Sequence, residues 1–370
     1  MLNIEWDREL QERVGQPLKP ERIQSLLVIL PGASGDVALS TTVIRYVKQV
    51  NPQCRVIYAT RKANITVAQL CPGVAETIEL PNEAIGSLSR RRYLDQFAGF
   101  ADAVVCPSCV PDDMNLLNHC NLVETLWLLS GVESRVPQKP SQKPQQVWLE
   151  AGADVESAVA VIGRSLAQRT ELMQAAARQT ALAVKDVARP RFLRGSGVRK
   201  HLRNVPLLLR LGLEAASPRH TRRLRGGSLS KSFVILSTQA NSLSGPPAGV
   251  TRALIRALRR DGRTVLHNVL DPCQAVPGTV PLVCSYAEFL ALRQGGVPFV
   301  GWRSGLCDIA AAAPAPMCVL YPATYEWAEE PISTFGFNAM NVAANCYEFV
   351  CRSVDDVVRS DFAAQLREKR

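Results

Sequence analysis

Short apolar runs alternate with helix-like stretches along this chain, and that alternation constrains its fold more than any other feature. The first run, residues 25–31, has the apolar character of a strand buried on both faces of a parallel sheet. Residues 37–50 then place apolar side chains on one helical face, and Asn51-Pro52 ends that helix. Further strands are expected at 54–59, 76–80 and 101–106, with helices at 65–70, 85–97 and 112–129. This order predicts βαβ units with right-handed crossovers.

A second alternating set begins at Phe233. Its expected strands are 233–237, 264–270, 280–283, 299–300 and 317–321, and its expected helices are 249–260, 286–294 and a third from Leu306. Between the two sets lie a Pro/Gln/Lys-rich linker at 137–147, an Ala-rich amphipathic helix at 155–184 and a basic stretch. We therefore predict an α/β fold with two doubly wound, Rossmann-like domains facing a cleft. The expected boundaries are 1–150 and 231–370 for these domains, with a helical, basic connector at 151–230.

Length and composition narrow the class of protein. A chain of 370 residues is too long for one ordinary core. No apolar run reaches the ~18–20 residues that a membrane-spanning helix needs, and the charged first 24 residues lack the apolar core of a signal peptide. The 11 cysteines are scattered and odd in number, which favours reduced thiols. We therefore expect a cytoplasmic protein.

The positive charge is concentrated in one segment. Residues 185–231 contain 13 Lys and Arg against Asp186 and Glu214, whereas the whole chain carries a net charge of +10. Such a segment can be a solvated connector, a surface for anionic lipid headgroups, or a nucleic-acid site. Phe192 is its single aromatic residue, which disfavours single-stranded nucleic acid. No nucleic-acid partner is expected.

The stretch 299–313 predicts an anion site. An apolar strand end turns at Gly301 and passes through Arg303, Ser304 and Gly305 into a helix of small residues. The unpaired N–H groups at the start of a helix favour phosphate, and an arginine adds a charge-assisted contact. Asp308 in the first turn can cap the helix or accept a hydrogen bond from a ribose hydroxyl. The alternative is an ordinary turn with its arginine in water.

The first glycine loop supplies a candidate base. Gly32, Ser34 and Gly35 lie at the carboxyl end of the first strand, where doubly wound sheets bind ligands. Asp36 follows and can accept a proton from a sugar hydroxyl, although an N-cap role would equally explain it. The loop lacks both the full dinucleotide fingerprint and the Walker pattern, which argues against an oxidoreductase and an NTPase.

Other polar groups at strand ends are weaker candidates. Cys106, Cys109, His119 and Cys120 do not have a standard zinc spacing, so no metal is expected, and His119 is a fallback base. His267 falls within a predicted strand and is expected to be a satisfied core or rim histidine. The remaining candidates offer hydrogen bonds to phosphate or ribose, or are capping residues of a turn; they are Ser237, Gln239, Asn241, Ser242 and Tyr321.

With both loops in view, the chain resembles the GT-B glycosyltransferases, in particular the ADP-heptose:lipopolysaccharide heptosyltransferases of glycosyltransferase family nine. The likeness lies in ILPGASGDVALSTTVIRYVKQVNP, CPGVAETIEL and FVGWRSGLCDIAAAAPAPMCVLYPAT. Arg303 stands where the family has an acidic residue, and Asp308 stands where it has histidine. The donor-phosphate loop is also altered, to STQANSLSG.

This resemblance implies a metal-independent, inverting transfer of a heptose or hexose-type sugar. Asp36 would be the base, Ser304 and Gly305 would meet the donor diphosphate, and Arg303 would offset its charge, so that Arg303→Ala would lose most turnover and stay folded. The donor would be an ADP- or GDP-linked sugar, with no separate cofactor. The acceptor would be a bacterial lipopolysaccharide, capsule polysaccharide or other glycoconjugate. The alternatives are a nucleotide-sugar epimerase, which needs no acceptor, and a non-catalytic scaffold of the same fold.

The basic segment generates the first testable prediction, that it holds the enzyme on the inner face of the plasma membrane. Reversing the charges of Arg222, Arg223 and Arg225 should abolish co-sedimentation with anionic liposomes, because headgroup attraction depends on these charges. Failure of the unmodified protein to bind such liposomes would contradict the prediction.

Overall fold

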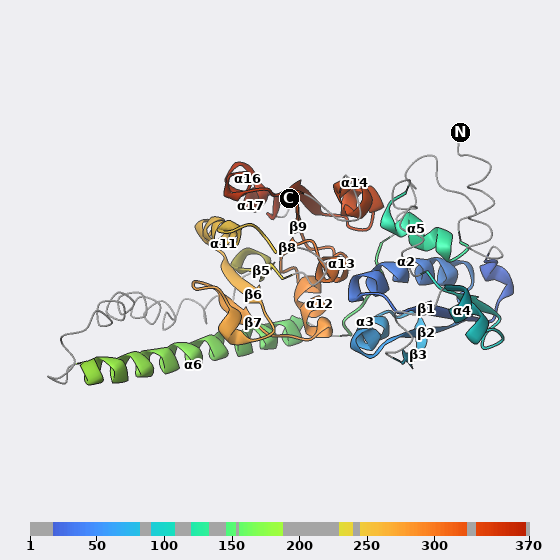
Figure 1. The fold of residues 1–370 in the computed structure, drawn as a ribbon, viewed down its shortest axis with the longest axis horizontal. Helices are drawn as coiled ribbons and strands as arrows, with labels where there is room; N and C mark the ends of the chain where they lie inside the picture. Colours follow the sequence, from blue (N-terminus) through green and yellow to red (C-terminus); the bar gives the residue numbers. More distant parts are fainter. Residues whose placement is uncertain are drawn as a thin grey trace.

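The chain forms two layered α/β lobes (Figure 1). The computed structural model describes residues 18–81, 90–107, 120–132, 146–152, 155–187, 229–239, 245–323 and 331–367. In these residues each lobe contains one sheet with all pairings parallel. The predicted fold class, two doubly wound domains side by side, is confirmed.

The first lobe has a sheet with strand order β3-β2-β1-β4. Strands β1 (Ser25–Leu30) and β2 (Arg55–Arg61) are buried along nearly their whole length, as the apolar run at residues 25–31 predicted. The strands are β1 Ser25–Leu30, β2 Arg55–Arg61, β3 Val74–Leu80 and β4 Ala103–Val105. The helices are η1 Pro20–Arg22, α2 Ser34–Val50, η2 Lys62–Asn64, α3 Ile65–Gln69, α4 Arg90–Gln96 and α5 Leu122–Leu129.

The second lobe has a sheet with strand order β10-β9-β8-β5-β6-β7. Its strands are β5 Phe233–Ser237, β6 Thr264–Asn268, β7 Val280–Leu282, β8 Phe299–Trp302, β9 Met317–Tyr321 and β10 Cys346–Val350. The larger helices are α11 Val250–Arg260, α12 Tyr286–Gln294, α13 Gly305–Ala310 and α16 Val354–Arg359. The shorter ones are α10 Leu229–Ser232, η5 Pro272–Gln274, α14 Pro331–Phe335, α15 Phe337–Met340 and α17 Phe362–Gln365.

The strand orders decide where a site can form. In the first sheet the order reverses beside β1, and in the second it reverses between β5 and β8. Loops at such reversal points splay apart and leave a crevice at the carboxyl ends of the strands. The two glycine loops of the sequence follow β1 and β8, so both lie at reversal points.

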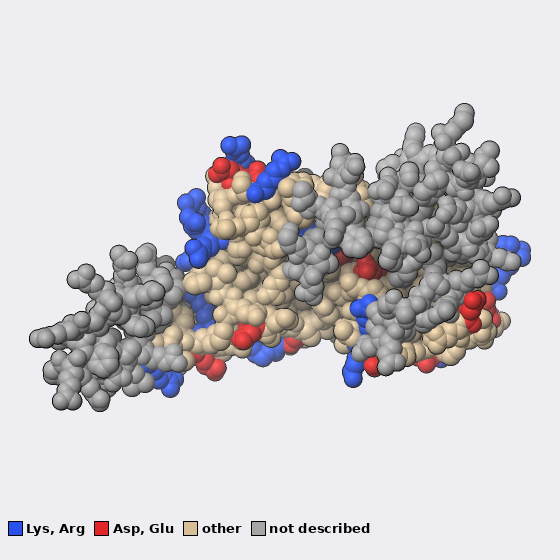
Figure 2. All heavy atoms as spheres, in the orientation of Figure 1, with Lys and Arg blue, Asp and Glu red and all other residues tan. Residues whose placement is uncertain are grey.

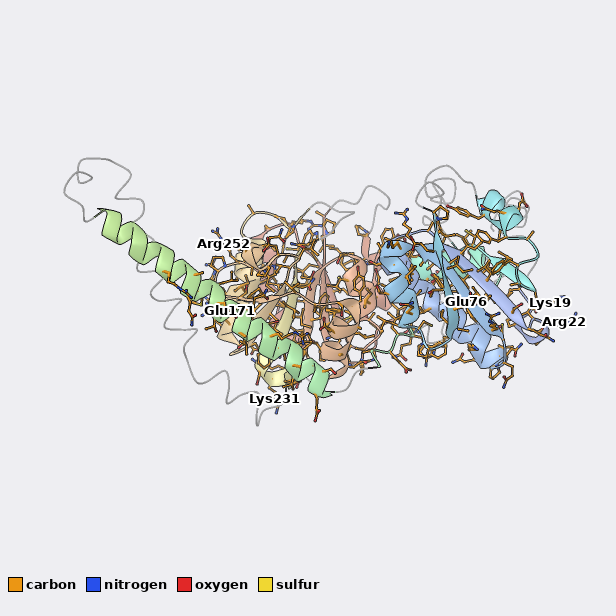
Figure 3. The ribbon with its side chains drawn as sticks, turned by 90° about the horizontal axis from the view of Figure 1, so that it is seen from below. Lys19, Arg22, Glu76, Glu171, Lys231 and Arg252 are labelled. Atoms are coloured by element: carbon orange, nitrogen blue, oxygen red, sulfur yellow. The ribbon has the colours of Figure 1, made fainter. Side chains whose placement is uncertain are left out.

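The long helix α6, Val155–Val187, packs by its first half against the second lobe. Ala158, Val161 and Ile162 are buried there, and Arg164 forms an ion pair with Glu288 of α12. Its second half extends past the lobe (Figure 1), and Figure 3 shows the same course from below with Glu171 on the helix. The predicted helix at 155–184 is confirmed.

Residues 146–152 cross from one lobe to the other. The N–H of Trp148 donates to Oγ1 of Thr41 in α2 (3.0 Å), and the N–H of Ala151 donates to Oε1 of Gln294 in α12 (3.3 Å). A further bond joins the lobes directly, from Nδ2 of Asn121 to the carbonyl of Ala339 (3.1 Å). These bonds fix how the two lobes face each other.

The sequence placed most element ends within a few residues, with clear exceptions. Strand β3 begins two residues before the expected Glu76, and β4 covers only the middle of 101–106. Strand β10 was not predicted, because its side chains are all half-buried and show no apolar run. The expected helices at 85–97 and 112–129 lie partly outside the described residues, and 188–228 lies wholly outside them. Among the helices that the structure does describe, none has the length and apolarity to cross a membrane.

Arg293 is a fully buried cation of the second lobe. Its Nη1 donates to the carbonyls of Val297 (2.7 Å) and Pro316 (3.0 Å), and its Nη2 donates to those of Ala315 (2.6 Å) and Ala310 (3.4 Å). Burial lowers the pKa of its guanidinium to about 9, which leaves it charged at neutral pH. The side chain thus joins α12, the end of α13 and the start of β9.

Arg293→Met should destabilise this lobe strongly, because four buried carbonyls lose their donor. A loss of roughly 3–5 kcal/mol is expected, which lowers the thermal midpoint by about 6 °C or more. The control is Arg256→Met on α11, where basic side chains gather on the surface (Figure 2). Among the described residues, Arg256 bonds only to the carbonyl of Arg252 in its own helix. Equal midpoints for the two variants would contradict the role of Arg293.

Candidate active site at the seam between the lobes

The amino end of α2 forms the first half of the site. Oδ2 of Asp36 accepts a hydrogen bond from the N–H of Ala33 (2.9 Å), so Asp36 caps its own helix. Gly32 lies under this carboxylate, because a Cβ there would be 2.6 Å from Oδ2. The N–H groups of Ser34, Gly35 and Asp36 meet no acceptor among the described residues. The first turn of α2 therefore presents unpaired donors.

The turn after β8 forms the second half. Ser304 precedes α13, and Arg303 donates from Nη1 to the carbonyl of Ser304 (3.0 Å) and to Oδ2 of Asp308 (2.8 Å). Its Nε donates to the carbonyl of Phe335 (3.3 Å), and the ring of Phe337 lies 5.0 Å from its guanidinium carbon. The guanidinium is thus bonded to Asp308 and to the carbonyls of Ser304 and Phe335, all in its own lobe.

The alternative interpretation of this stretch, an ordinary turn with its arginine in water, is contradicted by the burial of Arg303. Only 6% of the residue is accessible, and Asp308, expected to cap α13 or meet a ribose, is 3% accessible. The reason is that the two side chains neutralise each other across one helical turn, which allows both to be buried. Arg303→Ala would leave the Asp308 charge buried and unpaired, so we now expect that variant to lose stability as well as activity.

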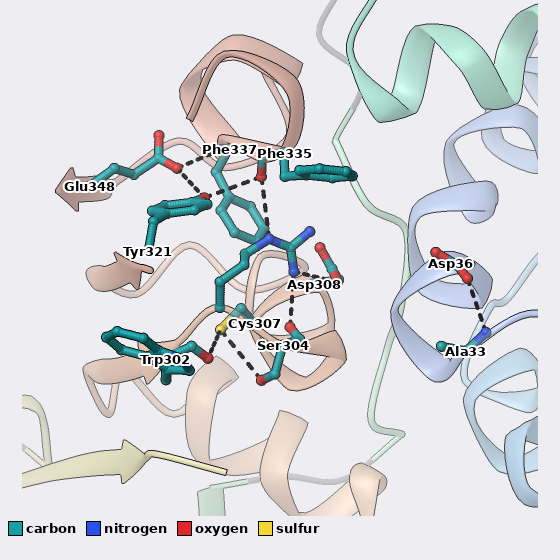
Figure 4. A network of polar contacts seen from close by, with 11 residues as sticks. Ala33, Asp36, Trp302, Ser304, Cys307, Asp308, Tyr321, Phe335, Phe337 and Glu348 are labelled. Atoms are coloured by element: carbon teal, nitrogen blue, oxygen red, sulfur yellow. Dashed lines mark hydrogen bonds and ion pairs between the residues drawn. The ribbon is translucent and has the colours of Figure 1, made fainter. Parts of the chain in front are cut away.

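The two glycine turns meet back to back. A Cβ on Gly35 would lie 2.3 Å from Oδ2 of Asp308 and 2.7 Å from Cα of Gly305. A Cβ on Gly305 would lie 2.8 Å from the nitrogen of Gly35 and 2.9 Å from Oγ of Ser34. We call this contact of Ser34 and Gly35 with Gly305 and Asp308 the seam. Figure 4 shows Asp36 and Asp308 on its two sides.

The charges at the seam act on one another. Burial raises the pKa of Asp36, while the Ala33 hydrogen bond and the positive charges of Arg303 and Arg61 oppose that rise. Burial also raises the pKa of Asp308 to about 6, despite its bond to Arg303, and the negative charge of Asp36 adds to the rise. A carboxylate with a raised pKa is a better proton acceptor, which suits Asp36 to act as a base.

The side chains of Tyr321 and Ser237, predicted to offer hydrogen bonds to phosphate or ribose, are turned away from solvent. Both are buried, and the hydroxyl of Tyr321 donates to the carbonyl of Phe335 (3.1 Å) and contacts Oε1 of Glu348 (2.5 Å). Tyr321 therefore supports Phe335, whose carbonyl also receives Arg303, as Figure 4 shows. Ser237 and Tyr321 are the last residues of β5 and β9, as predicted, but their side chains are buried in the core.

The remaining candidates have mixed outcomes. Gln239 is exposed and its Nε2 lies 3.4 Å from Oε1 of Gln274. His267 is a satisfied histidine as expected: its Nδ1 accepts from the N–H of Val276 (3.1 Å), its Nε2 lies 3.3 Å from Oγ1 of Thr238, and burial lowers its pKa to about 4. Asn241, Ser242, Cys109 and His119 lie outside the described residues. Within the described ranges no group of His, Cys, Asp and Glu is arranged to hold a metal ion.

Phe337 and Glu348 are functional-site residues that the sequence did not reveal. Oε1 of Glu348 accepts from the N–H of Phe337 (2.7 Å) as well as contacting Tyr321. Glu348 thereby positions Phe337, whose ring lies against the guanidinium of Arg303. No local pattern marks them, because they act across β9 and β10 and meet Arg303 only in the folded lobe.

Comparison with solved structures supports the fold. Escherichia coli ADP-heptose lipopolysaccharide heptosyltransferase II superposes with a TM-score of 0.51 at 13% identity, covering 92% of this chain and 97% of that chain. A glycosyl transferase of family 9 from Veillonella parvula gives a TM-score of 0.47 at 9% identity, covering 94% and 90%. No family model matches the sequence, and no curated protein matches it. The first likeness shows that the chain has a GT-B-like fold.

The seam predicts a steric effect of Gly305→Ala. The added methyl would meet backbone of the opposite lobe, which cannot rotate away as a side chain can, so the lobes must shift. Overpacking of this kind costs about 1–3 kcal/mol and should lower the thermal midpoint by roughly 2–8 °C. Gly245→Ala is the control, since a Cβ there meets nothing within 4 Å. Equal thermal midpoints for Gly305→Ala and Gly245→Ala would contradict the close contact at the seam.

Proposed function

We propose that this protein is a glycosyltransferase that moves a sugar from a nucleotide-diphosphate sugar to a saccharide acceptor. The observation that carries the proposal is the seam, where unpaired amides of α2, the turn before α13 and the Asp36 carboxylate come together. An anionic leaving group needs such donors, and an attacking hydroxyl needs such a base. The heptosyltransferase with the same fold is named for an ADP-heptose donor, which favours a nucleoside diphosphate here.

The reaction would be a single displacement with inversion. Asp36 accepts the proton of an acceptor hydroxyl as the oxygen attacks the anomeric carbon. The bond from that carbon to the diphosphate oxygen breaks, and the electron pair leaves with the nucleoside diphosphate. The N–H groups of Ser34 and Gly35, and the turn at Ser304 and Gly305, would stabilise that charge without a metal ion.

The lobes must part before a donor can enter this seam. Gly35 and Gly305 are in contact, so no diphosphate fits between them in the described arrangement. Opening and closing of lobes around a ligand is a common step in catalysis, since closure excludes water from the reacting atoms. The contact of Gly35 with Gly305 would then be broken when a donor is bound.

The finer assignments rest on chemistry and on the sequence resemblance. An ADP- or GDP-linked heptose or hexose would be the donor. Lipopolysaccharide, capsule polysaccharide or another glycoconjugate would be the acceptor, approached from the first lobe. The basic segment 185–231 would keep the protein beside a lipid-linked acceptor at the inner face of the plasma membrane.

A non-catalytic scaffold is a second candidate, because Arg303 and Asp308 neutralise each other at the place where an enzyme would bind its diphosphate. A scaffold would bind nucleotide weakly, and its partner binding would not depend on Asp36.

Nucleotide binding and turnover separate the two candidates. A thermal-shift series with ADP, GDP, UDP and CDP should show one preferred base, because binding to the native state raises its stability. Asp36→Asn should retain that shift, since the amide oxygen can still cap α2, and should lose about 100-fold or more in transfer rate. Asp355→Asn, at an exposed position of α16, is the matched control. Absence of a shift with every nucleotide, or full transfer by Asp36→Asn, would contradict the proposal.

A further inference from the structure

The carboxylate of Asp308 occupies the position in which an anion would be expected. It belongs to the second lobe, yet its Oδ2 lies against Gly35 in the first turn of α2, close enough that no Cβ would fit between them. The same oxygen accepts from Nη1 of Arg303 (2.8 Å). One side chain thus reaches both the cation of its own lobe and the amino end of a 17-residue helix of the other lobe.

The fit of this carboxylate is incomplete. Its second oxygen, Oδ1, is buried and has no hydrogen-bond partner among the described residues. The N–H groups of Ser34, Gly35 and Asp36 at the amino end of α2 also have none there. Gly35 and Asp308 are buried whereas Ser34 and Asp36 are half-buried, so the cost of water lost without a new bond falls mainly on Oδ1 of Asp308. The seam is therefore closed by contact and charge, with its polar groups poorly matched.

A phosphoryl group would match these donors better. It has several acceptor oxygens around one centre, so it can accept from the α2 amides and from Nη1 of Arg303 together. It cannot do so while Asp308 holds Arg303, and the negative charge of Asp36 across the seam further disfavours a second anion beside Asp308. The carboxylate must move aside before a diphosphate can bind.

We propose that Asp308 is an internal competitor for the diphosphate of the donor, so that donor affinity is set by displacement of this carboxylate from Arg303 and from the amino end of α2. This inference rests on the proposed function and adds to it a residue that determines affinity for the donor class. The ligand chemistry is that of a pyrophosphate group, whether free or part of a nucleoside diphosphate. Displacement of Asp308 would also remove its contact with Gly35 of the other lobe.

A purely structural role for Asp308 predicts the opposite effect of its removal. If the carboxylate served only to position Arg303, then Asp308→Asn would let the guanidinium move and would weaken the binding of a diphosphate. If it competes, the same change strengthens binding, because the amide has nearly the same shape and carries no negative charge.

The test is calorimetric titration of the full chain with pyrophosphate and, separately, with ADP. Asp308→Asn should bind pyrophosphate about tenfold more tightly than the unmodified protein does. A tenfold change in affinity lies within the usual range of coupling between two interacting sites of a protein. Asp355→Asn, at an exposed position of α16, is the matched control: it removes one negative charge outside the seam and should leave the affinity unchanged. If Asp308→Asn does not fold, Asp308→Ser removes the same charge with a smaller side chain.

Each result is decisive. Equal or weaker binding by Asp308→Asn, while the unmodified protein binds, overturns the competition and leaves the proposed function standing. Equal tightening by Asp308→Asn and Asp355→Asn also overturns it, because a general charge effect would then suffice. No binding of either ligand by any of the proteins overturns the proposed function, and the competition with it. Tightening of pyrophosphate but not of ADP would show that the seam admits the anion without the nucleoside, contrary to a donor role.

Discussion

The close approach of Gly35 to Gly305 is the constraint on which the rest of this structure depends. Two backbones from different lobes touch at a point where neither could carry a methyl group. That contact exists because each glycine opens a helix at a reversal point of its own sheet, and because residues 146–152 and Asn121 tie the lobes in this orientation.

Charge placement follows from the same contact. Asp36 and Asp308 approach from opposite lobes, and the positive charge of Arg303 opposes the rise in pKa of both. The ring of Phe337 lies against the guanidinium of Arg303, and Glu348 bonds to both Phe337 and Tyr321. The position of Arg303 therefore does not depend on a ligand. A site built this way is preorganised on one lobe and is completed by the other.

Much of the fold could be read from the sequence, because buried parallel strands and glycine turns leave strong local patterns. Topology predicted each glycine loop at the carboxyl end of its own sheet, but the direct contact of Gly35 with Gly305 is seen only in the structure. The burial of Arg303 could not be read, since its partners Phe335 and Phe337 lie more than 30 residues away and contact it only in the folded lobe. Tyr321 and Ser237 show the same limit: alternation along a strand places a residue at the edge of a sheet but does not say which way its side chain turns.

The central claim is that the seam opens to hold a diphosphate between the amino end of α2 and the turn before α13. The most direct measurement is a crystal structure of the protein grown with ADP. The account predicts electron density for the β-phosphate within hydrogen-bond distance of the N–H groups of Ser34 and Gly35, with Asp308 turned away from Arg303. Phosphate density on another face of the protein, with the Arg303–Asp308 pair intact and Gly35 still against Gly305, would contradict it.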